Sequence, residues 1–327
     1  MDQVKLLVTG ITGKVGANFL PAFLAEPRFA GWSIRALCNN RVIDHPAVDV
    51  VRGSLADDAA VRAAMQDVTH VLHMAAVKES PALAIDVGVK GMFNLLEAFR
   101  VSPTASQFLL IGGDCSVGHI FHDYGVPITE QAPRRAYPGC YALTKVIEEV
   151  MLEQYRFQYG INACCLRAPW IMEKDDFRHV LSFREQFGGP LWSDFFSAAD
   201  LARLAQADNV PLLHDAHGRP LKRNFIHVSD LVRAILVALD NPAATGELFN
   251  IAMTEPVDYG QAAALLQASQ GLEPVAVPTP YFSNWLDNAK AGHLLGWRPL
   301  IDLEQLIERA WSYVRAPDDP RIVWYPG

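Results

Sequence analysis

A short apolar run near the start of the chain leads into three spaced glycines, and this feature most limits how the chain can fold. Residues 4–8 (VKLLV) read as a parallel strand covered on both faces, and Gly10, Gly13 and Gly16 follow before an apolar helical stretch. In such a turn the first glycine permits a sharp bend, the second lets backbone approach a phosphate, and the third lets the helix pack closely. The stretch predicts a dinucleotide-binding turn, although similar turns also occur without a ligand.

Alternating strand and helix patterns continue through the first half of the chain. Such alternation implies an α/β fold, a Rossmann-like doubly wound parallel sheet with right-handed crossovers. We expect strands at residues 32–37, 48–51, 68–74, 108–111 and 164–166, and helices at 17–25, 90–100 and 141–158.

The composition of the chain limits which partners it can bind and which cell compartment we expect for it. The 327 residues include 28 Lys and Arg against 36 Asp and Glu, and the net charge of −8 gives no basic field for nucleic acid or anionic lipid. No apolar run approaches the roughly 18 residues of a membrane helix, so we expect a cytoplasmic protein without nucleic-acid or membrane partners. The five cysteines show no disulfide or zinc spacing, and His214 with His217 lacks further ligands, so no metal is expected.

The residues after the second expected strand bear on the cofactor. An acid at this place holds the ribose 2′-hydroxyl of NAD, whereas an arginine suits the 2′-phosphate of NADP. This chain has Asn39, Asn40 and Arg41 there, so we expect NADP or NAD with NADP slightly favoured, unless Arg41 is only a solvated loop charge. The candidate cofactor contacts are Gly10, Thr12, Gly13, Val15, Gly16, Asn39, Asn40, Arg41, Ser54, Leu55, Met74, Ala75, Ala76, Tyr141, Lys145 and Pro169.

Tyr141 and Lys145 are the strongest candidates for chemistry. They stand four apart at the start of an expected helix, and residues i and i+4 share one helix face. A cation beside a phenol favours the phenolate, so Lys145 is expected to lower the pKa of Tyr141 toward that of a useful base. The alternative is an ordinary amphipathic helix, since this spacing is common by chance.

These features together resemble the extended short-chain dehydrogenase/reductase family, the NAD-dependent epimerases and dehydratases. The resemblance covers nearly the full length and is far more specific for the family than for one reaction. It rests on Thr9-Gly10-x-x-Gly13-x-x-Gly16, His73-Met74-Ala75-Ala76, Lys90-Gly91-x-x-Asn94-Leu95-Leu96-Glu97-Ala98, Tyr141-x-x-x-Lys145, Leu166-Arg167-Ala168-Pro169, Arg223-Asn224-Phe225-Ile226-His227-Val228-Ser229-Asp230 and Leu295-Gly296-Trp297-Arg298-Pro299.

The resemblance implies two domains. Residues 1–172 plus about 223–253 would form the dinucleotide-binding domain, and about 173–222 plus 254–327 a smaller C-terminal substrate domain. In nucleotide-sugar epimerases the arginine matching Arg223 meets the substrate diphosphate, and the segments of Asp287 and Arg298 border the substrate. The candidate substrate contacts are Lys78, Asp114, Cys115, Ser116, Arg223, Asp287 and Arg298.

Two departures from the family pattern bear on chemistry. The family usually has Ser or Thr on the loop after the fifth strand, and counting along that loop places Gly113 there, so Ser116 is our candidate to replace the hydroxyl. The dehydratases carry Thr-Asp-Glu on this loop; here Asp114 remains as an acid but Cys115 replaces the glutamate, which disfavours dehydration. Gly88 stands where the family commonly has Asn before the next helix.

The sequence therefore indicates an NAD(P)-dependent oxidoreductase or epimerase acting on a secondary alcohol of a carbohydrate. Tyr141, Lys145 and Ser116 would be catalytic, and the family suggests a homodimer. The acids Glu173, Asp175, Asp176 and Asp194 would repel a diphosphate if they faced the site, which favours a sugar or sugar acid over a nucleotide sugar. The alternative is a catalytically inactive nucleotide-binding regulatory or scaffold protein of the same fold.

Overall fold

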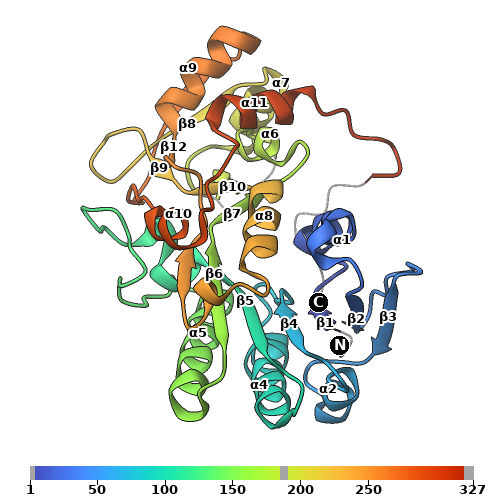
Figure 1. The fold of residues 1–327 in the computed structure, drawn as a ribbon. Helices are drawn as coiled ribbons and strands as arrows, with labels where there is room; N and C mark the ends of the chain where they lie inside the picture. The colour runs from blue at the N-terminus through green and yellow to red at the C-terminus, as the bar shows by residue number, and fades with distance from the viewer. Residues whose placement is uncertain (1–3, 185–190, 320–327) are drawn as a thin grey trace.

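The computed structural model describes residues 4–184 and 191–319, and a seven-stranded parallel sheet forms its centre (Figure 1). The order reverses between the neighbouring strands β1 (Lys5–Thr9) and β4 (His70–His73), and ligands of such sheets bind at this point, outside the carboxyl ends of the strands. The full order is β11 (Leu248–Asn250), β6 (Ala163–Ala168), β5 (Gln107–Gly113), β4, β1, β2 (Ser33–Cys38) and β3 (Val48–Arg52).

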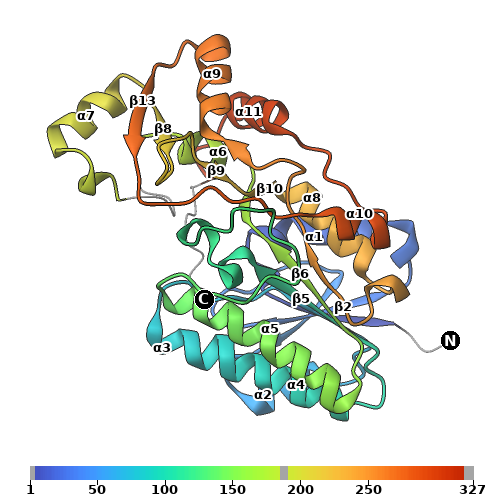
Figure 2. The same ribbon diagram turned by 90° about the vertical axis from the view of Figure 1, so that its left-hand side faces the viewer.

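Helices cover both faces of this sheet (Figure 2). Successive residues of β1 serve opposite faces: Leu6 and Val8 join the core under one helix layer, and Leu7 joins the core under the other. This explains why β1 reads as a continuous apolar run. The first layer contains α1 (Lys14–Ala25) and α8 (Val228–Ala238), with α10 (Ala289–Leu295) beside them; the second contains α2 (Asp58–Ala64), α4 (Gly91–Val101) and α5 (Cys140–Tyr159).

A second apolar core lies beyond the large sheet. It joins residues from Met172 to Phe225 with residues from Met253 to Ala310, so two stretches distant in sequence pack together.

The boundaries of the two expected domains stay a prediction, and their residues 1–3, 185–190 and 320–327 lie outside the described residues. The elements here are β7 (Trp170–Met172), α6 (Asp176–Val180), η5 (Trp192–Asp194), α7 (Ala198–Gln206), β8 (Val210–His214), β9 (Lys222–Arg223), β10 (Phe225–His227), β12 (Val257–Asp258), α9 (Tyr259–Gln270), β13 (Pro274–Pro278) and α11 (Leu303–Ser312).

The short elements of the chain include a π-helix, η2 (Ala84–Lys90), directly before α4. A Cβ on Gly88 of η2 would lie 3.2 Å from Cβ of Thr144, so glycine at this departure from the family pattern lets η2 pack closely on α5. The others are η1 (Pro27–Phe29), α3 (Pro81–Leu83), η3 (Asp114–Val117), η4 (His119–Phe121) and η6 (Pro242–Ala244).

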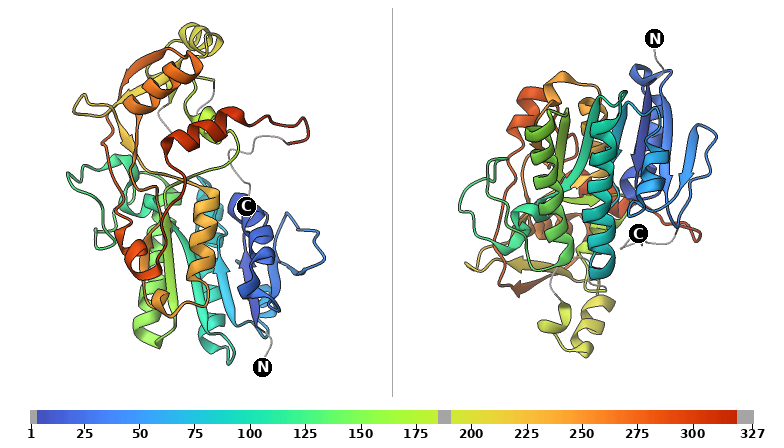
Figure 3. Two further views of the ribbon diagram at one scale, coloured as in Figure 1. Left: turned by 45° about the horizontal axis from the view of Figure 1, so that its top comes forward. Right: turned by 90° about the horizontal axis from the view of Figure 1, so that it is seen from below.

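The predicted fold class is confirmed. Each strand expected in the first half of the chain is present within two residues of its expected limits, and the two longest expected helices are α4 and α5. Helix α5 runs for 20 residues and ends at Gly160, whose positive φ of 64° provides a left-handed cap. The views from the side and from below show α4 and α5 lying next to each other on the outer face (Figures 2 and 3).

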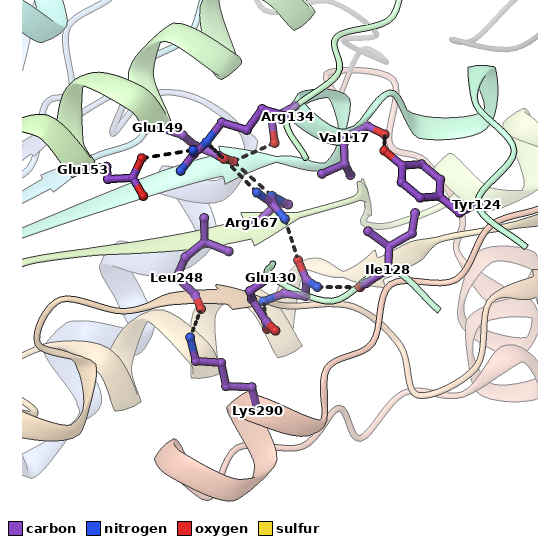
Figure 4. Close-up of polar contacts among 12 residues, drawn as sticks. Val117, Tyr124, Ile128, Glu130, Arg134, Glu149, Glu153, Arg167, Leu248 and Lys290 are labelled. Atoms are coloured by element: carbon purple, nitrogen blue, oxygen red, sulfur yellow. Dashed lines mark hydrogen bonds and ion pairs between the residues drawn. The ribbon is translucent and has the colours of Figure 1, made fainter. Parts of the chain in front are cut away.

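A buried carboxylate ties α5 to the sheet and to the loop after β5 (Figure 4). Both oxygens of Glu149 accept from Arg167 of β6, at 3.0 Å from Nε and 2.8 Å from Nη2. Ser116 of η3 donates its hydroxyl to the same carboxylate at 2.7 Å, and Arg134 donates Nε at 3.2 Å. The Arg167 and Glu149 side chains are each 1% exposed, so water does not screen this pair. The charge pairs lower the pKa of Glu149 although burial opposes the shift.

Replacing Arg167 with leucine should therefore destabilise the fold strongly. Removing one partner of a buried ion pair leaves an uncompensated charge and typically costs about 3–5 kcal/mol. Urea titration of the free energy of unfolding checks this. Because the folded pKa of Glu149 is depressed, the stabilisation is present above the ordinary glutamate pKa and is lost as pH falls through the depressed value.

The matched control is Arg62→Leu. Arg62 pairs with Asp58 at 2.8 Å on α2, but the two side chains are 55% and 53% exposed. Such a surface pair contributes at most about 1 kcal/mol. Equal losses in the two variants would contradict the structural role of Arg167.

Candidate active site

A cavity of about 500 Å³ lies at the carboxyl ends of β1, β2, β4 and β5. It is continuous from the glycine turn to Arg223, so one cavity reaches from the predicted cofactor contacts to the predicted substrate contacts. Most of the residues predicted to bind cofactor or substrate line it: Gly10, Thr12, Gly13, Val15, Asn39, Asn40, Arg41, Ser54, Leu55, Met74, Ala75, Ala76, Lys78, Asp114, Cys115, Tyr141, Lys145, Pro169 and Arg223.

The glycine turn is built for close approach of backbone. Gly10 has φ +75°, and a Cβ there would lie 2.7 Å from the Ala75 nitrogen, so the turn touches the end of β4. A Cβ on Gly16 would lie 2.3 Å from the Ile11 carbonyl oxygen, where helix α1 begins to pack on the turn. Gly13 caps α1 without a side chain, which leaves the positive end of the helix facing the cavity. These residues fit a bound pyrophosphate.

Thr9 joins the turn to the end of β4. Its hydroxyl oxygen lies 2.6 Å from Nδ1 of His73 and accepts from the nitrogens of Met74 and Ala75, each at 3.3 Å. Burial and the charge of Lys145 lower the pKa of His73 to about 3, so its ring is neutral. The small residues after β4 are thereby held at the cavity wall.

One end of the cavity is formed by the residues that follow β2 and β3. Asn39, Asn40 and Arg41 line it directly after β2. Asn94 of α4 donates Nδ2 to the carbonyl oxygen of Leu55, a predicted cofactor contact, at 2.9 Å. The family pattern Gly91-x-x-Asn94 is explained in the same place, because a Cβ on Gly91 would lie 2.7 Å from Cβ of Leu55.

Tyr141 has Lys78 over its ring and Lys145 one helical turn further along the same face, but its pKa is raised. Nζ of Lys78 lies 3.8 Å from the centre of the Tyr141 ring, and burial lowers the pKa of Lys78 to about 8. Nζ of Lys145 donates to the Ile111 carbonyl oxygen at 3.2 Å and to Oε2 of Glu148 at 2.7 Å. Burial first, and then nearby negative groups that include Glu148, raise the pKa of Tyr141 well above its ordinary value. The predicted lowering is wrong because burial disfavours the charged phenolate, and nearby negative groups add to this shift.

Three cavity-lining side chains, those of Asp114, His119 and Arg223, are linked by hydrogen bonds at one end of the cavity. Nδ1 of His119 lies 2.7 Å from Oδ2 of Asp114, and Arg223 donates Nε to Nε2 of His119 at 2.8 Å. A nitrogen that accepts from arginine carries no proton, so His119 is neutral and donates Nδ1–H to Asp114. Burial and Arg223 lower the pKa of His119, in agreement with the neutral ring. The Arg223 guanidinium stacks on Trp170, with its carbon 3.7 Å from the ring centre.

Gly16 of the turn packs against Ile11 and does not line this cavity, and three predicted catalytic or substrate-binding residues are not brought to it either. Ser116 is fully buried and bonded to Glu149, because η3 turns its hydroxyl toward α5, so it does not replace the missing loop hydroxyl. Asp287 accepts from the Ala289 nitrogen at 2.8 Å, a local turn before α10. Arg298 is exposed, and its carbonyl oxygen accepts from Arg233. None of the three lines the described cavity.

Gly113, at the family's hydroxyl position, lines the cavity close to Tyr141. A Cβ on Gly113 would lie 3.8 Å from Oη of Tyr141 but only 2.8 Å from Sγ of Cys115. The thiol therefore occupies the space beside residue 113. Burial raises the pKa of Cys115 to about 12, so the group is an uncharged thiol.

Sequence reasoning missed several groups. Glu148 stands three residues after Lys145, a helical contact spacing that was a usable signal. Lys14 lines the cavity and pairs with Asp176 of α6 at 2.6 Å, which joins the glycine turn to the second core. His119, Phe121 and Tyr137 also line the cavity, and no spacing rule marks them.

The acids of the segment after β7 do not face the substrate. Asp176 pairs with Lys14, Glu173 accepts from Asn18 at 2.7 Å, and Asp175 pairs with Arg315. None of these, nor Asp194, lines the described cavity, so the expected repulsion of a diphosphate has no basis in this geometry.

The turn, the parallel sheet and the Tyr141 helix define a Rossmann-like α/β fold of the dinucleotide-binding class. Residues 6–252 match the model of the NAD dependent epimerase/dehydratase family, and the chain belongs to this family. The extended short-chain dehydrogenase/reductase resemblance is thereby confirmed.

Curated relatives share about a quarter of their residues with this chain. A 3-beta-hydroxysteroid dehydrogenase of Mycolicibacterium neoaurum is 26% identical over 364 aligned positions, and the match spans 95% of this chain and 92% of the relative. UDP-glucuronate 4-epimerase 4 of Arabidopsis thaliana is 24% identical over 304 residues, and the match spans 81% of this chain and only 63% of that relative. Relatives at this distance act on different substrates.

Solved structures agree on the fold. A short-chain dehydrogenase/reductase superfamily protein from Agrobacterium tumefaciens with bound NAD has a TM-score of 0.78 and 25% identity, covering 94% of this chain and 95% of that one. UDP-glucuronic acid 4-epimerase from Bacillus cereus in complex with NAD has a TM-score of 0.73 and 17% identity, covering 95% and 98%. Within the described residues, no helix has the length and apolar character to cross a membrane.

Proposed function

We propose that this protein is an NAD(P)-dependent oxidoreductase or epimerase that acts on a secondary alcohol of a carbohydrate. The observation that carries this proposal is one cavity lined by the glycine turn, Tyr141 and Lys145 together. Bound nicotinamide supplies the acceptor and donor of hydride. Tyr141 would exchange a proton with the substrate oxygen at Oη, and Lys145 would hold positive charge beneath it. Dehydration is disfavoured because Cys115 replaces the glutamate of the dehydratase loop.

The substrate end favours a small carbohydrate such as a sugar or sugar acid. Arg223 lines the cavity with its guanidinium held by His119 and stacked on Trp170. A pre-oriented guanidinium suits a carboxylate or a single phosphate, because little side-chain entropy is lost on binding. Lys78 adds a second nearby cation.

Tyr141→Phe should abolish turnover and leave cofactor affinity nearly unchanged. The phenol serves proton transfer, which typically contributes about 10²–10⁴-fold to the rate, whereas the glycine turn carries most of the cofactor contacts. Purified protein is screened with NAD and NADP against sugars, sugar acids and nucleotide sugars, by reduced-nicotinamide absorbance and product stereochemistry. We expect sugar acids to turn over in the wild type.

The control is Tyr159→Phe, on the same helix but 48% exposed and far along it from the cavity. A Tyr141→Phe variant that keeps its activity refutes the role of Tyr141. Strong protection of the wild type from heat by UDP, without protection or turnover by sugars and sugar acids, returns the substrate to a nucleotide sugar. Cofactor binding without turnover of any compound favours the inactive regulatory or scaffold protein.

NADP is proposed to bind at least as tightly as NAD. The groove after β2 presents Asn39, Asn40 and Arg41 and no carboxylate at these positions, which suits a 2′-phosphate. Arg41→Ala should weaken NADP and leave NAD nearly unchanged, as measured by calorimetric titration. Much tighter NAD binding together with no effect of Arg41→Ala would contradict the preference.

A homodimer through α4 and α5 belongs to the same proposal. Phe93 and Val150 on these helices are 48% and 37% exposed, large apolar groups that a partner copy would cover, whereas Leu152 of α5 is buried in the chain's own core and is not available to a partner. Light scattering at micromolar concentration should give twice the mass of the chain, and a monomer would contradict the proposal. A cytoplasmic location is also proposed, supported by the five cysteines, all free thiols.

A further inference from the structure

Helix α5 places a buried carboxylate against the lysine of the candidate active site. Nζ of Lys145 lies 2.7 Å from Oε2 of Glu148, three residues later on the same helix. The two side chains are 4% and 1% exposed, so their attraction is little screened by water or salt. Lys145 in turn lies one helical turn from Tyr141, on the same face.

Glu148 differs from its neighbour Glu149 in what it binds. Glu149 serves Arg167, Ser116 and Arg134, all groups of the surrounding fold. Glu148 bonds instead to a group that lines the cavity. A buried ion pair is weak evidence for a stabilising role, because desolvation offsets much of the attraction. What Glu148 contacts is instead the lysine that shares a helix face with Tyr141.

We propose that Glu148 is a positioning residue of this active site, which holds the Lys145 ammonium in place and whose negative charge sets the pH range in which Tyr141 and Lys145 work together. This inference rests on the proposed function, since it assigns a role to Tyr141 and Lys145 in proton transfer. Glu148 itself touches neither substrate nor cofactor in this role.

The surrounding charges give the sign of the effect. Burial lowers the pKa of Lys145, but Glu148, with smaller contributions from Cys115 and Cys165, more than reverses this and the pKa is raised. Burial also raises the pKa of Glu148 itself, Lys145 opposes that shift and Glu149 adds to it. Glu148 is also one of the groups that raise the pKa of Tyr141, after burial, Cys115 and Tyr137. The titratable and charged groups that act on one or both are Glu148 of α5, Asp114 and Cys115 of η3, His73 of β4, Cys165 of β6, Lys78 after β4 and Tyr137 before α5.

Glu148→Gln removes the charge and keeps the shape and an acceptor for Lys145. Without the carboxylate the pKa of Tyr141 falls, so the acid limb of the pH–rate profile for alcohol oxidation moves to lower pH. The pKa of Lys145 falls as well, so the alkaline limb also moves down. A charge lost at contact distance typically shifts a pKa by about one unit or more, which we expect for the alkaline limb, with a smaller shift in the acid limb. Cofactor affinity should change by less than about 3-fold, a difference of about 0.7 kcal/mol.

Glu153→Gln is the matched control on the same helix. Its side chain is 37% exposed and pairs with Arg134 at 3.1 Å, so neither limb should move. Glu148→Asp keeps the negative charge on a shorter side chain. The limbs of its pH–rate profile should therefore lie closer to those of the wild type than the limbs of the glutamine variant do. Thermal unfolding verifies that each variant is folded.

A second readout does not need turnover. Tyrosinate absorbance is titrated in the wild type and in Tyr141→Phe, each with and without the Glu148→Gln substitution, and the difference isolates Tyr141. We expect Tyr141 to titrate at lower pH when Glu148 is replaced by glutamine. Identical titrations, or unmoved limbs in an active Glu148→Gln variant, overturn the role of Glu148. A shifted titration in a protein that turns over no compound supports the role of Glu148 and counts against the proposed function alone.

Discussion

One carboxylate, that of Glu149, holds together the parts of the chain on which the candidate site depends. It meets Arg167 from the sheet, Ser116 from the turn after β5 and Arg134 from the loop that follows (Figure 4). Arg167 also donates Nη1 to Asn250 at 3.3 Å, and Asn250 donates to the Ile128 carbonyl oxygen at 2.9 Å. Helix, sheet and cavity loop are therefore positioned by one connected set of buried bonds.

The two neighbouring glutamates of α5 have different roles because their side chains point in different directions. Successive helix residues are about 100° apart, so Glu148 and Glu149 leave the helix toward different surroundings. Glu149 meets fixed arginines and stabilises the fold, whereas Glu148 meets the lysine that stands below the reacting groups.

Local pattern was sufficient for the sheet, the glycine turn and the Tyr141–Lys145 face, because each depends on residues near one another in the chain. It failed where a distant partner decides a side chain's direction. Ser116 turns to Glu149, which is 33 residues away, and not to the cavity. Two family motifs, one ending at Asp230 and one containing Trp297, contact each other in the fold. Trp297 donates to the Asp230 carbonyl oxygen at 3.1 Å, and the Asp230 carboxylate accepts from the Leu300 and Ile301 nitrogens.

The hydrogen bonds that link Asp114, His119 and Arg223 could not be predicted from the sequence for the same reason. Asp114 and Arg223 are 109 positions apart, and no spacing rule connects them. Gly113 shows a different limit of sequence reasoning, because the sequence does not reveal that the Cys115 thiol fills the space beside this glycine. A serine at 113 would bring its Cβ to 2.8 Å from the Cys115 sulfur, so the usual hydroxyl cannot return while that thiol keeps its place. A hydroxyl at 113 therefore requires the Cys115 side chain to rotate or to be replaced, so a redesign of this loop has to treat positions 113 and 115 together.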